Sequence, residues 1–344
     1  MMRYFIAETN NHEQHAGTKA RQDVSDILTT IDWRPLTVRK RFGGSTLDKF
    51  KAIPDVYFDW GKITCSVKSG DTVLIQYPVN TYPKVAPFAL PAIRRMRSKG
   101  AKIIMVIHDL ERLRTNSDVS EDRFFALADV VICHNDVMKS MLRERYPSLK
   151  LVSLEVFDYL TDEPTRPIDE RNGIDIAGNL NPGKSAYVYE LAKCFPQASF
   201  HLYGPFFNVN SAESRWYRGS FPPEKLPSIL NGKFGLVWDG DSTATCSGAK
   251  GEYMRINNPH KLSLYLASNE PVIIWHQAAE ASFVKNNNLG IVASSIADAI
   301  IQIEALTDKD YISMTQSVHA MCEKVRSGYH LRKALDEAFK LVGE

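Results

Sequence analysis

Short apolar runs alternate with amphipathic segments along almost the whole chain. Continuous apolar runs are typical of strands buried on both faces of a parallel sheet, whereas apolar residues three to four positions apart indicate helices. On this basis we expect strands at 3–7, 33–38, 71–77, 101–107, 130–133 and 151–157, and helical segments at 19–31, 47–64, 87–99 and 135–145. The alternation of strand and helix predicts a doubly wound α/β sheet in the first half of the chain.

The pattern starts again after 161–167, a segment rich in proline and charge that we take as a domain boundary. Strands are expected at 174–177, 199–203, 234–238, 271–275 and 289–292, with helices at 184–194, 223–230, 259–268, 281–286, 296–306 and 311–325. We therefore predict two α/β domains, at 1–160 and 168–327. A last helix, near 331–342, exceeds what the second sheet requires, so we expect residues 328–344 to pack back on the first domain.

Composition narrows the function classes. The 344 residues are 44% hydrophobic, and 42 basic residues nearly balance 40 acidic ones, so no overall field points to a nucleic acid partner. The five cysteines are widely spaced and form no C-x-x-C pair, which argues against a disulfide framework and a zinc site and favours a reducing compartment. No stretch approaches the ~20 apolar residues of a membrane span, and the apolar N-terminal run is too short for a signal peptide. We expect a cytoplasmic protein.

Two kinds of association stay open. The basic stretch 94–99 would suit peripheral contact with the inner face of a membrane, although the simpler interpretation is a solvated helix end. Nothing in the pattern decides between a monomer and a homo-oligomer.

The helix expected at 259–268 has an unusual charge at its start. Asn258 suits an N-cap and Pro259 a first helical residue, but His260 and Lys261 place cations where exposed amides and the helix dipole already favour anions. An absent anion, such as a phosphate, would be shared by these amides and Lys261. The alternative is a solvated lysine beside a capping asparagine.

Further polar groups follow the strands of the second domain, at the edge where open α/β sheets bind ligands. The turn 178–184 contains Asn179 and ends at Lys184, so its amides and the lysine could receive a phosphate; an ordinary strand–helix turn is the alternative. Tyr203 ends the next strand and Tyr217 precedes a proline turn, where each could stack on a base or pack in the core.

In the first domain, His108 and Asp109 end a buried strand. Asp109 could take a proton from the hydroxyl group of a substrate, or it could cap the following helix. Gly17 and Thr18, before the first helix, could bring backbone amides close to a ligand or simply form a turn.

The segment 239–255 precedes the helix that starts with Pro259. Asp239-Gly240-Asp241 matches the D-x-D pattern that holds a divalent ion in some nucleotide-sugar enzymes, but three residues are a weak signal. We prefer a turn or a mobile active-site loop and expect no metal site. Glu252, within this segment just before the helix, and His260, in the first turn of that helix, are candidates for contact with a sugar.

The stretch from Asp239 through 251–253 and 257–267 to the run 271–273 resembles bacterial β-1,6-galactofuranosyltransferases and related cytoplasmic glycosyltransferases, among them the glucosyltransferases that extend glycans on serine-rich adhesins. The likeness is dense over 234–292 and is supported by Gly178-Asn179 and by Ile107-His108-Asp109. It implies a GT-B fold, with two Rossmann-like domains facing a cleft. It also implies that Lys261 and Lys184 neutralise the donor diphosphate, with Asn179, Tyr203, Tyr217 and Asn258 as weaker members of the nucleotide site. On the nucleotide side of Lys184, relatives often carry an arginine in a shorter turn.

The resemblance implies a glycosyltransferase that transfers a hexose, foremost galactofuranose from UDP-galactofuranose, to a glycan or glycolipid acceptor of a surface polysaccharide. Such enzymes stabilise the leaving diphosphate with basic side chains instead of a metal, so no cofactor beyond the donor is expected. An inverting reaction would need one general base, for which we select Asp109. UDP-glucose or UDP-N-acetylglucosamine as donor, a nucleotide-sugar epimerase and a non-catalytic UDP-sugar-binding partner subunit stay open as alternatives, whereas a dinucleotide oxidoreductase would need a glycine fingerprint that neither domain has.

Overall fold

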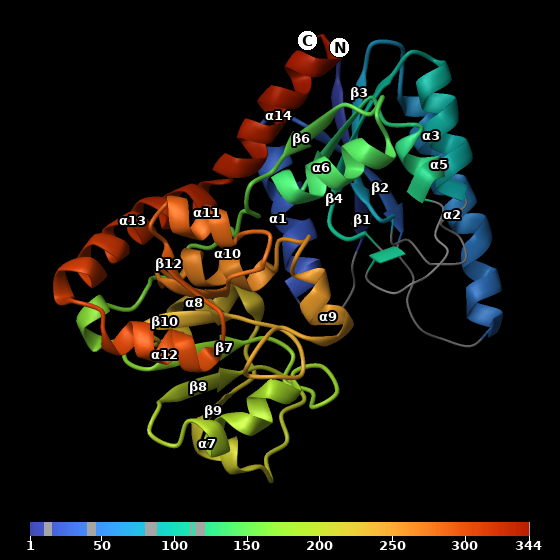
Figure 1. The fold of residues 1–344 in the computed structure, drawn as a ribbon. Helices are drawn as coiled ribbons and strands as arrows, with labels where there is room; N and C mark the ends of the chain where they lie inside the picture. The colour runs from blue at the N-terminus through green and yellow to red at the C-terminus, as the bar shows by residue number, and fades with distance from the viewer. Residues whose placement is uncertain (10–15, 40–45, 80–87, 111, 114–120, 344) are drawn as a thin grey trace. The chain divides into compact units, whose positions relative to one another are not determined.

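The computed structural model describes residues 1–9, 16–39, 46–79, 88–110, 112–113 and 121–343. It contains two parallel six-stranded sheets with helices, so the α/β class predicted from the sequence is confirmed (Figure 1). The chain divides into two compact units. Residues 1–13, 20–154 and 331–344 form the first unit, and residues 14–19 and 155–330 form the second.

The sheet of the first unit has the strand order β2-β1-β3-β4-β5-β6, and all neighbouring strands are parallel. Its strands are β1 (Arg3–Thr9), β2 (Arg34–Arg39), β3 (Thr72–Tyr77), β4 (Lys102–Ile107), β5 (Val130–Cys133) and β6 (Leu151–Ser153). The helices are α1 (Ala16–Thr30), α2 (Thr46–Ser66), α3 (Ala89–Ser98), α5 (Glu121–Phe125), α6 (Asp136–Arg145) and α14 (Tyr329–Val342). The central strands β3 and β5 are buried throughout, which explains their continuous apolar sequence.

The last helix packs within the first unit from Leu331 onward. The guanidinium carbon of Arg3 lies 4.1 Å from the centre of the Phe339 ring, and Lys150 Nζ donates a hydrogen bond of 2.6 Å to the carbonyl oxygen of Leu341. Figure 1 accordingly shows α14 beside the start of the chain. The end of the chain thus completes the core of the unit formed by its beginning.

The sheet of the second unit has the order β12-β11-β10-β7-β8-β9, again parallel. Its strands are β7 (Ile174–Ala177), β8 (Phe200–Tyr203), β9 (Tyr217–Gly219), β10 (Phe234–Val237), β11 (Val272–Trp275) and β12 (Gly290–Ala293). The α-helices are α7 (Leu191–Cys194), α8 (Leu226–Ile229), α9 (Gly248–Tyr253), α10 (His260–Ala267), α11 (Ala281–Asn286), α12 (Ile296–Glu304) and α13 (Asp308–Ser327). Short 3₁₀ helices lie at η2 (Ile168–Glu170), η3 (Ala186–Glu190), η4 (Ala212–Trp216) and η5 (Pro223–Lys225).

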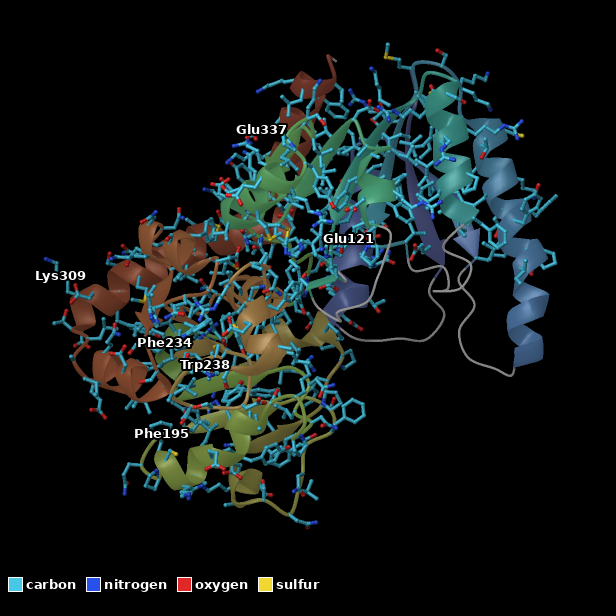
Figure 2. All side chains as sticks on the ribbon, turned by 45° about the vertical axis from the view of Figure 1, so that its right-hand side comes forward. Glu121, Phe195, Phe234, Trp238, Lys309 and Glu337 are labelled. Carbon is cyan, nitrogen blue, oxygen red and sulfur yellow. The ribbon has the colours of Figure 1, made fainter. Side chains whose placement is uncertain are left out.

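Helix α10 is fixed to the middle of this sheet by Tyr265. The Tyr265 hydroxyl accepts a hydrogen bond of 2.8 Å from the amide of Ala177, at the end of β7. A Cβ atom on Gly235 would lie 2.1 Å from the Tyr265 ring, so only glycine lets the helix approach β10 this closely. Phe234 and Trp238, at the two ends of β10, are buried in the same core (Figure 2). The start of α10 is therefore held at a defined place beyond the sheet.

Several boundaries differ from the sequence-based expectation. The strand expected at 151–157 ends at Ser153, the segment 239–255 contains α9, and the short strand β9 was not predicted, because three residues with a central arginine carry no apolar run. Helix α10 has Pro259 at its N-cap instead of Asn258, whose side-chain amide donates to the carbonyl oxygen of Glu155. Among the described helices, none combines the length and apolar character that crossing a membrane requires.

Candidate active site

Lys261 lies in the first turn of α10 and reaches the carboxyl end of β10. Its Nζ atom donates to the carbonyl oxygen of Trp238 at 2.7 Å and lies 2.9 Å from Oδ1 of Asp239. Two of its three N–H donors are therefore used, and the third is available for an anion. The lysine predicted to hold a phosphate and the first aspartate of the D-x-D pattern thus form one ion pair.

The loop after Asp239 folds tightly on itself. Gly240 has a positive φ of 116°, and a Cβ atom there would lie 2.3 Å from the carbonyl oxygen of Ser247. The Asp241 carboxylate lies close to Gly248 at the start of α9, where an added Cβ would be 2.8 Å from it. Among the described residues, no group of three or more His, Cys, Asp or Glu side chains is arranged to hold a metal ion.

The two candidates for sugar contact have different surroundings. Glu252 is exposed on α9 and accepts a hydrogen bond of 2.7 Å from Nε of Arg255. His260 packs against Tyr159, with ring centres 5.1 Å apart, and its buried Nε2 atom has no hydrogen-bond partner within the described ranges. Burial, with a smaller contribution from the nearby ammonium of Lys19, lowers the pKa of His260 to about 3. The ring is therefore neutral at physiological pH.

Gly17 and Thr18 lie inside the first turn of α1, not in a loop before the helix as we expected. This turn groups with the second unit: Lys19 Nζ donates to the carbonyl oxygen of Leu160 at 2.6 Å and lies 4.6 Å from the centre of the Tyr159 ring. Because Tyr159 also contacts His260, the structure brings the start of α1 and the start of α10 together.

The turn 178–185 differs from the expected helix start. The Asn179 side chain accepts from the amide of Asn181, and the Asn181 side chain accepts from the amide of Gly183. The amide of Lys184 donates to the Asn181 carbonyl oxygen, and only a 3₁₀ helix and the short α7 follow, where we predicted a helix over 184–194. These asparagine side chains accept hydrogen bonds from backbone amides that could otherwise bond within a helix or to a phosphate. Of the groups in this turn that we predicted to bind a phosphate, the half-buried Lys184 side chain is therefore the main remaining candidate.

Tyr217 belongs to an aromatic stack beside this turn. Its ring lies parallel to Phe207, with centres 4.6 Å apart, and Phe207 in turn stacks on Tyr189 at 5.7 Å. The Tyr217 hydroxyl donates to the carbonyl oxygen of Gly204 at 3.1 Å. The half-buried Tyr217 ring thus stands on a rigid base next to the carboxyl end of β8.

Tyr203 faces a different environment. Its side chain is buried at 4% exposure and lines a pocket together with Arg166, His201, Arg218, Ile229 and Asn231. Neither Lys261 nor Lys184 lines this pocket. The structure groups Lys261, Asp239 and the 178–185 turn at the adjacent ends of β10 and β7, where Tyr187 hydrogen-bonds the same Trp238 carbonyl oxygen as Lys261. The backbone of Tyr203 borders this turn, since its carbonyl oxygen accepts from the amide of Gly178, but its side chain lines the other pocket.

In the first unit, His108 and Asp109 follow β4, as expected, and both are half-buried. His108 Nε2 lies 2.7 Å from Oε1 of Gln76. Sequence reasoning missed His134, which follows β5, is 1% exposed and lies 3.1 Å from the carbonyl oxygen of Ile107 through its Nε2 atom. Burial lowers the pKa of His134 to about 4. The polar groups at the carboxyl ends of β3, β4 and β5 thus form one cluster. The sequence signal that could have indicated His134 is its place directly after a strand.

Comparisons with known proteins identify the chain. Family models described as the N-terminal and C-terminal domains of glucosyltransferase 3-like proteins match residues 3–156 and 174–338. The chain is 31% identical to the β-1,6-galactofuranosyltransferase WbbI of Escherichia coli K12, and the alignment spans 97% of each of the two chains. The chain belongs to the glucosyltransferase 3-like family. It is a glycosyltransferase, as the resemblance implied.

Another relative and two solved structures agree with this assignment to a glycosyltransferase family. Glucosyltransferase 3 of Streptococcus parasanguinis is 26% identical over 98% of both chains. An α-glucosyltransferase solved in complex with UDP has the same fold, with a TM-score of 0.65 and 12% identity over the full length of both chains. The pneumococcal O-GlcNAc transferase GtfA, solved with UDP and GlcNAc, has a TM-score of 0.52 and 14% identity over 85% of this chain and 60% of its own. The glucosyltransferase 3-like chain therefore has the GT-B fold that the sequence predicted.

Proposed function

We propose that this glycosyltransferase transfers galactofuranose from UDP-galactofuranose to a hydroxyl of a glycan acceptor in the synthesis of a surface polysaccharide or glycoconjugate. The observation that carries the proposal is the 31% identity with the Escherichia coli β-1,6-galactofuranosyltransferase over 97% of both chains. UDP as the nucleotide is supported further by the complexes of structural relatives with UDP.

The donor diphosphate is assigned to the start of α10. Lys261 is already oriented by Trp238 and Asp239, the helix amides point toward the same place, and Lys184 contributes a second cation from the neighbouring turn. Tyr217 is assigned to the uracil because a stacked ring on a rigid base can extend its stack to a base. Asn179, Asn258 and the first turn of α1, with Gly17 and Thr18, complete the nucleotide side. Glu252 and His260 are assigned to the sugar.

The proposed reaction inverts the anomeric centre. An acceptor hydroxyl attacks C1 of the sugar, the new C1–O bond forms as the bond from C1 to the diphosphate oxygen breaks, and UDP leaves with that electron pair. Asp109 takes the hydroxyl proton as general base, while Lys261 and Lys184 balance the charge that develops on the diphosphate. No metal or cofactor is needed in this scheme.

Glucose from UDP-glucose is the second candidate donor, because glucosyltransferase 3 of Streptococcus parasanguinis aligns over 98% of both chains. Its identity is lower, at 26% against 31%, which favours galactofuranose.

We also propose that the enzyme reaches its acceptor at a membrane surface through α2 and α3. Tyr57 and Phe58 of α2 are 69% and 57% exposed, and Lys62 lies 4.5 Å from the centre of the Phe58 ring. The adjacent α3 exposes Arg94 and Arg95. Along residues 53–66 and α3 the acidic side chains are Asp59, which is buried, and Asp55, which is 32% exposed and lies 3.6 Å from Arg39. Aromatic rings and cations thus predominate on a face that suits anionic headgroups.

A donor panel tests the assignment. The purified chain is incubated with UDP-galactofuranose, UDP-galactopyranose, UDP-glucose or UDP-N-acetylglucosamine and with p-nitrophenyl hexosides as acceptors, and UDP release and the product linkage are measured. We expect acceptor-dependent UDP release with UDP-galactofuranose above all other donors. Faster turnover of UDP-glucose would replace the donor assignment. Tight UDP binding without turnover of any donor would identify a non-catalytic nucleotide-sugar-binding subunit.

A further inference from the structure

A pocket of about 280 Å³ lies on the second unit and is lined by the residues that surround Tyr203. This volume is near the lower end of small-molecule sites and is large enough for a phosphate with one attached sugar ring. Arg166 comes from the segment before η2, Arg218 from β9 and Asn231 from the connection between α8 and β10. Residues far apart in the sequence thus converge on one concave place.

The lining is cationic and rich in hydrogen-bonding groups. The lining residues include two arginines, a histidine, a tyrosine and an asparagine, and within the described part of the chain none of them is acidic. The Oδ1 atom of Asn231 is buried and has no hydrogen-bond partner among the residues that the structure describes. Guanidinium groups bind phosphate oxygens through charge-assisted hydrogen bonds, and a buried acceptor without a donor favours a ligand that carries hydroxyl groups.

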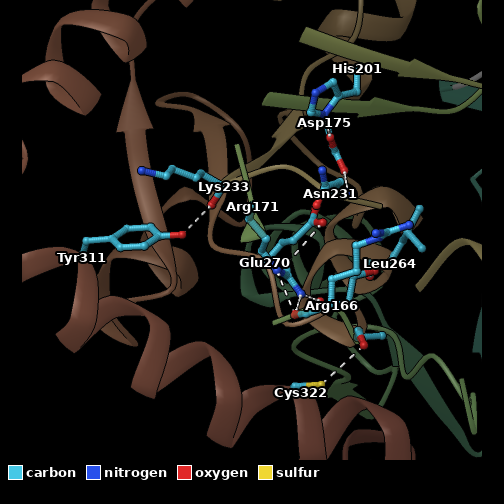
Figure 3. A network of polar contacts seen from close by, with 12 residues as sticks. Arg166, Arg171, Asp175, His201, Asn231, Lys233, Leu264, Glu270, Tyr311 and Cys322 are labelled. Atoms are coloured by element: carbon cyan, nitrogen blue, oxygen red, sulfur yellow. Dashed lines mark hydrogen bonds and ion pairs between the residues drawn. The ribbon is translucent and has the colours of Figure 1, made fainter. Parts of the chain in front are cut away.

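The wall of the pocket is preformed. His201, 5% exposed, donates from Nδ1 to Oδ1 of Asp175 at 2.7 Å, and the amide of Asn231 donates to the other carboxylate oxygen at 2.8 Å (Figure 3). A Cβ atom on Gly232 would lie 2.7 Å from the Asp175 carboxylate carbon, so glycine is required where this loop closes over Asp175.

Two buried residues, Arg171 and Glu270, fix the backbone of Arg166. The buried Arg171 donates from Nη2 and Nε to the Arg166 carbonyl oxygen, at 2.9 and 3.2 Å, and pairs with Glu270 at 3.3 Å. Burial, and next the neighbouring Asp175 carboxylate, raise the pKa of Glu270 well above its usual range. The network in Figure 3 thus links the pocket wall to Glu270, in the turn between α10 and β11.

The pocket is separate from the proposed diphosphate site. Asn231 precedes β10, whereas Trp238 and Asp239, which hold Lys261, follow it. A strand of this length spans about 13 Å at ~3.3 Å per residue. The Asn231 side of the pocket and the proposed diphosphate site thus lie at opposite ends of β10.

We propose that this pocket is a second ligand site, which binds a phosphomonoester, with Arg166 and Arg218 on the phosphate and Tyr203 and Asn231 on the hydroxyl groups of an attached sugar. The shared chemistry is the phosphate group, and its source is either the phosphomonoester of a sugar phosphate or free phosphate.

The test is calorimetric titration of glucose 6-phosphate, and separately of inorganic phosphate, into the full chain with the donor site saturated by UDP. We expect binding of both, tighter for the sugar phosphate, and a loss of about tenfold or more for each of Arg166→Ala and Arg218→Ala. Arg215→Ala is the matched control, because Arg215 is exposed near Arg218 but does not line the pocket. Lys261→Ala should retain the phosphomonoester binding.

Three results would overturn the proposal: no binding of either probe to the wild-type chain, unchanged binding in the double variant Arg166→Ala/Arg218→Ala, or loss of binding in Lys261→Ala. The last result would place the anion at the donor site. Equal affinity for both probes would assign the site to free phosphate and overturn the roles of Tyr203 and Asn231. UDP titration of the double variant separates this proposal from the proposed function, since UDP binding should be unchanged.

Discussion

The ammonium nitrogen of Lys261 lies 2.9 Å from a carboxylate oxygen of Asp239, and the two side chains are only 17% and 19% exposed. A lysine normally loses much rotamer freedom when it binds a ligand, but this one is already held by Asp239 and by the Trp238 carbonyl oxygen. The ion pair therefore fixes the cation at the carboxyl end of β10. The same carboxylate neutralises part of the charge that a diphosphate would meet.

Replacing Lys261 by alanine should weaken UDP binding by about 1.5–3 kcal/mol, because an ionic contact with a phosphate is lost. Calorimetric titration in EDTA measures this directly. Lys285→Ala, which removes an exposed lysine from α11, is the control and should bind UDP like the wild type. Equal binding by Lys261→Ala and the wild type would remove Lys261 from the donor site.

Asp239→Asn should strengthen UDP binding on the order of threefold to tenfold in EDTA. The asparagine oxygen still accepts a hydrogen bond from Lys261, but the negative charge beside the diphosphate is gone. The metal interpretation of the D-x-D pattern predicts the reverse: UDP binding by the wild type would need Mg²⁺, and the variant would lose it. Titrations with and without Mg²⁺ distinguish the two.

The Lys261–Asp239 pair also shows what could be read from the sequence. The apolar runs of β3 and β4 and the charge at the start of α10 were visible because each is a local pattern. The pairing of residues 239 and 261 was not visible, because two separate motifs meet only after β10 and α10 pack. Arg166 and Arg218 were missed for the same reason. His134 carries no motif, since a single histidine after a strand is usually structural.

Asp109→Asn should reduce transfer by about two to four orders of magnitude and leave the affinity for UDP unchanged, since a general base acts on the acceptor and not on the nucleotide. Initial rates of UDP release with a saturating acceptor, together with UDP titration, measure the two effects separately. Asp136→Asn is the control, because Asp136 is 86% exposed on α6. A variant that keeps wild-type rates would require another general base.

The face formed by α2 and α3 should bind vesicles rich in phosphatidylglycerol and not vesicles of phosphatidylcholine alone. Each basic residue near an anionic surface contributes about 1 kcal/mol, so the triple variant Lys62→Ala/Arg94→Ala/Arg95→Ala should bind on the order of a hundredfold more weakly in a sedimentation assay. The triple variant Lys193→Ala/Lys285→Ala/Lys309→Ala removes the same charge from exposed positions of the second unit. Equal loss in both variants would mean that only net charge matters.

His134 should make the chain less stable in acid. Its pKa is about 4 in the folded state and about 6.5 in an unfolded chain, so the unfolded state binds the proton first. Stability from this group is complete above about pH 6.5 and is lost as the pH falls toward about 4, by roughly 3 kcal/mol in total. Free energies of unfolding from urea titrations at several pH values measure the slope.

His134→Gln isolates this contribution. The glutamine amide can donate to the Ile107 carbonyl oxygen as the ring nitrogen does, but it does not titrate. The variant should therefore lose less stability than the wild type between about pH 6.5 and about pH 4, by roughly 3 kcal/mol. Protonation of His260 acts in the same direction, and the raised pKa of Glu270 acts in the opposite one, but both groups stay in wild type and variant and cancel in the difference. His319→Gln, at an exposed position of α13, should reproduce the wild-type slope, and a His134→Gln slope as steep as the wild type would show that this ring is not the group that acid titrates.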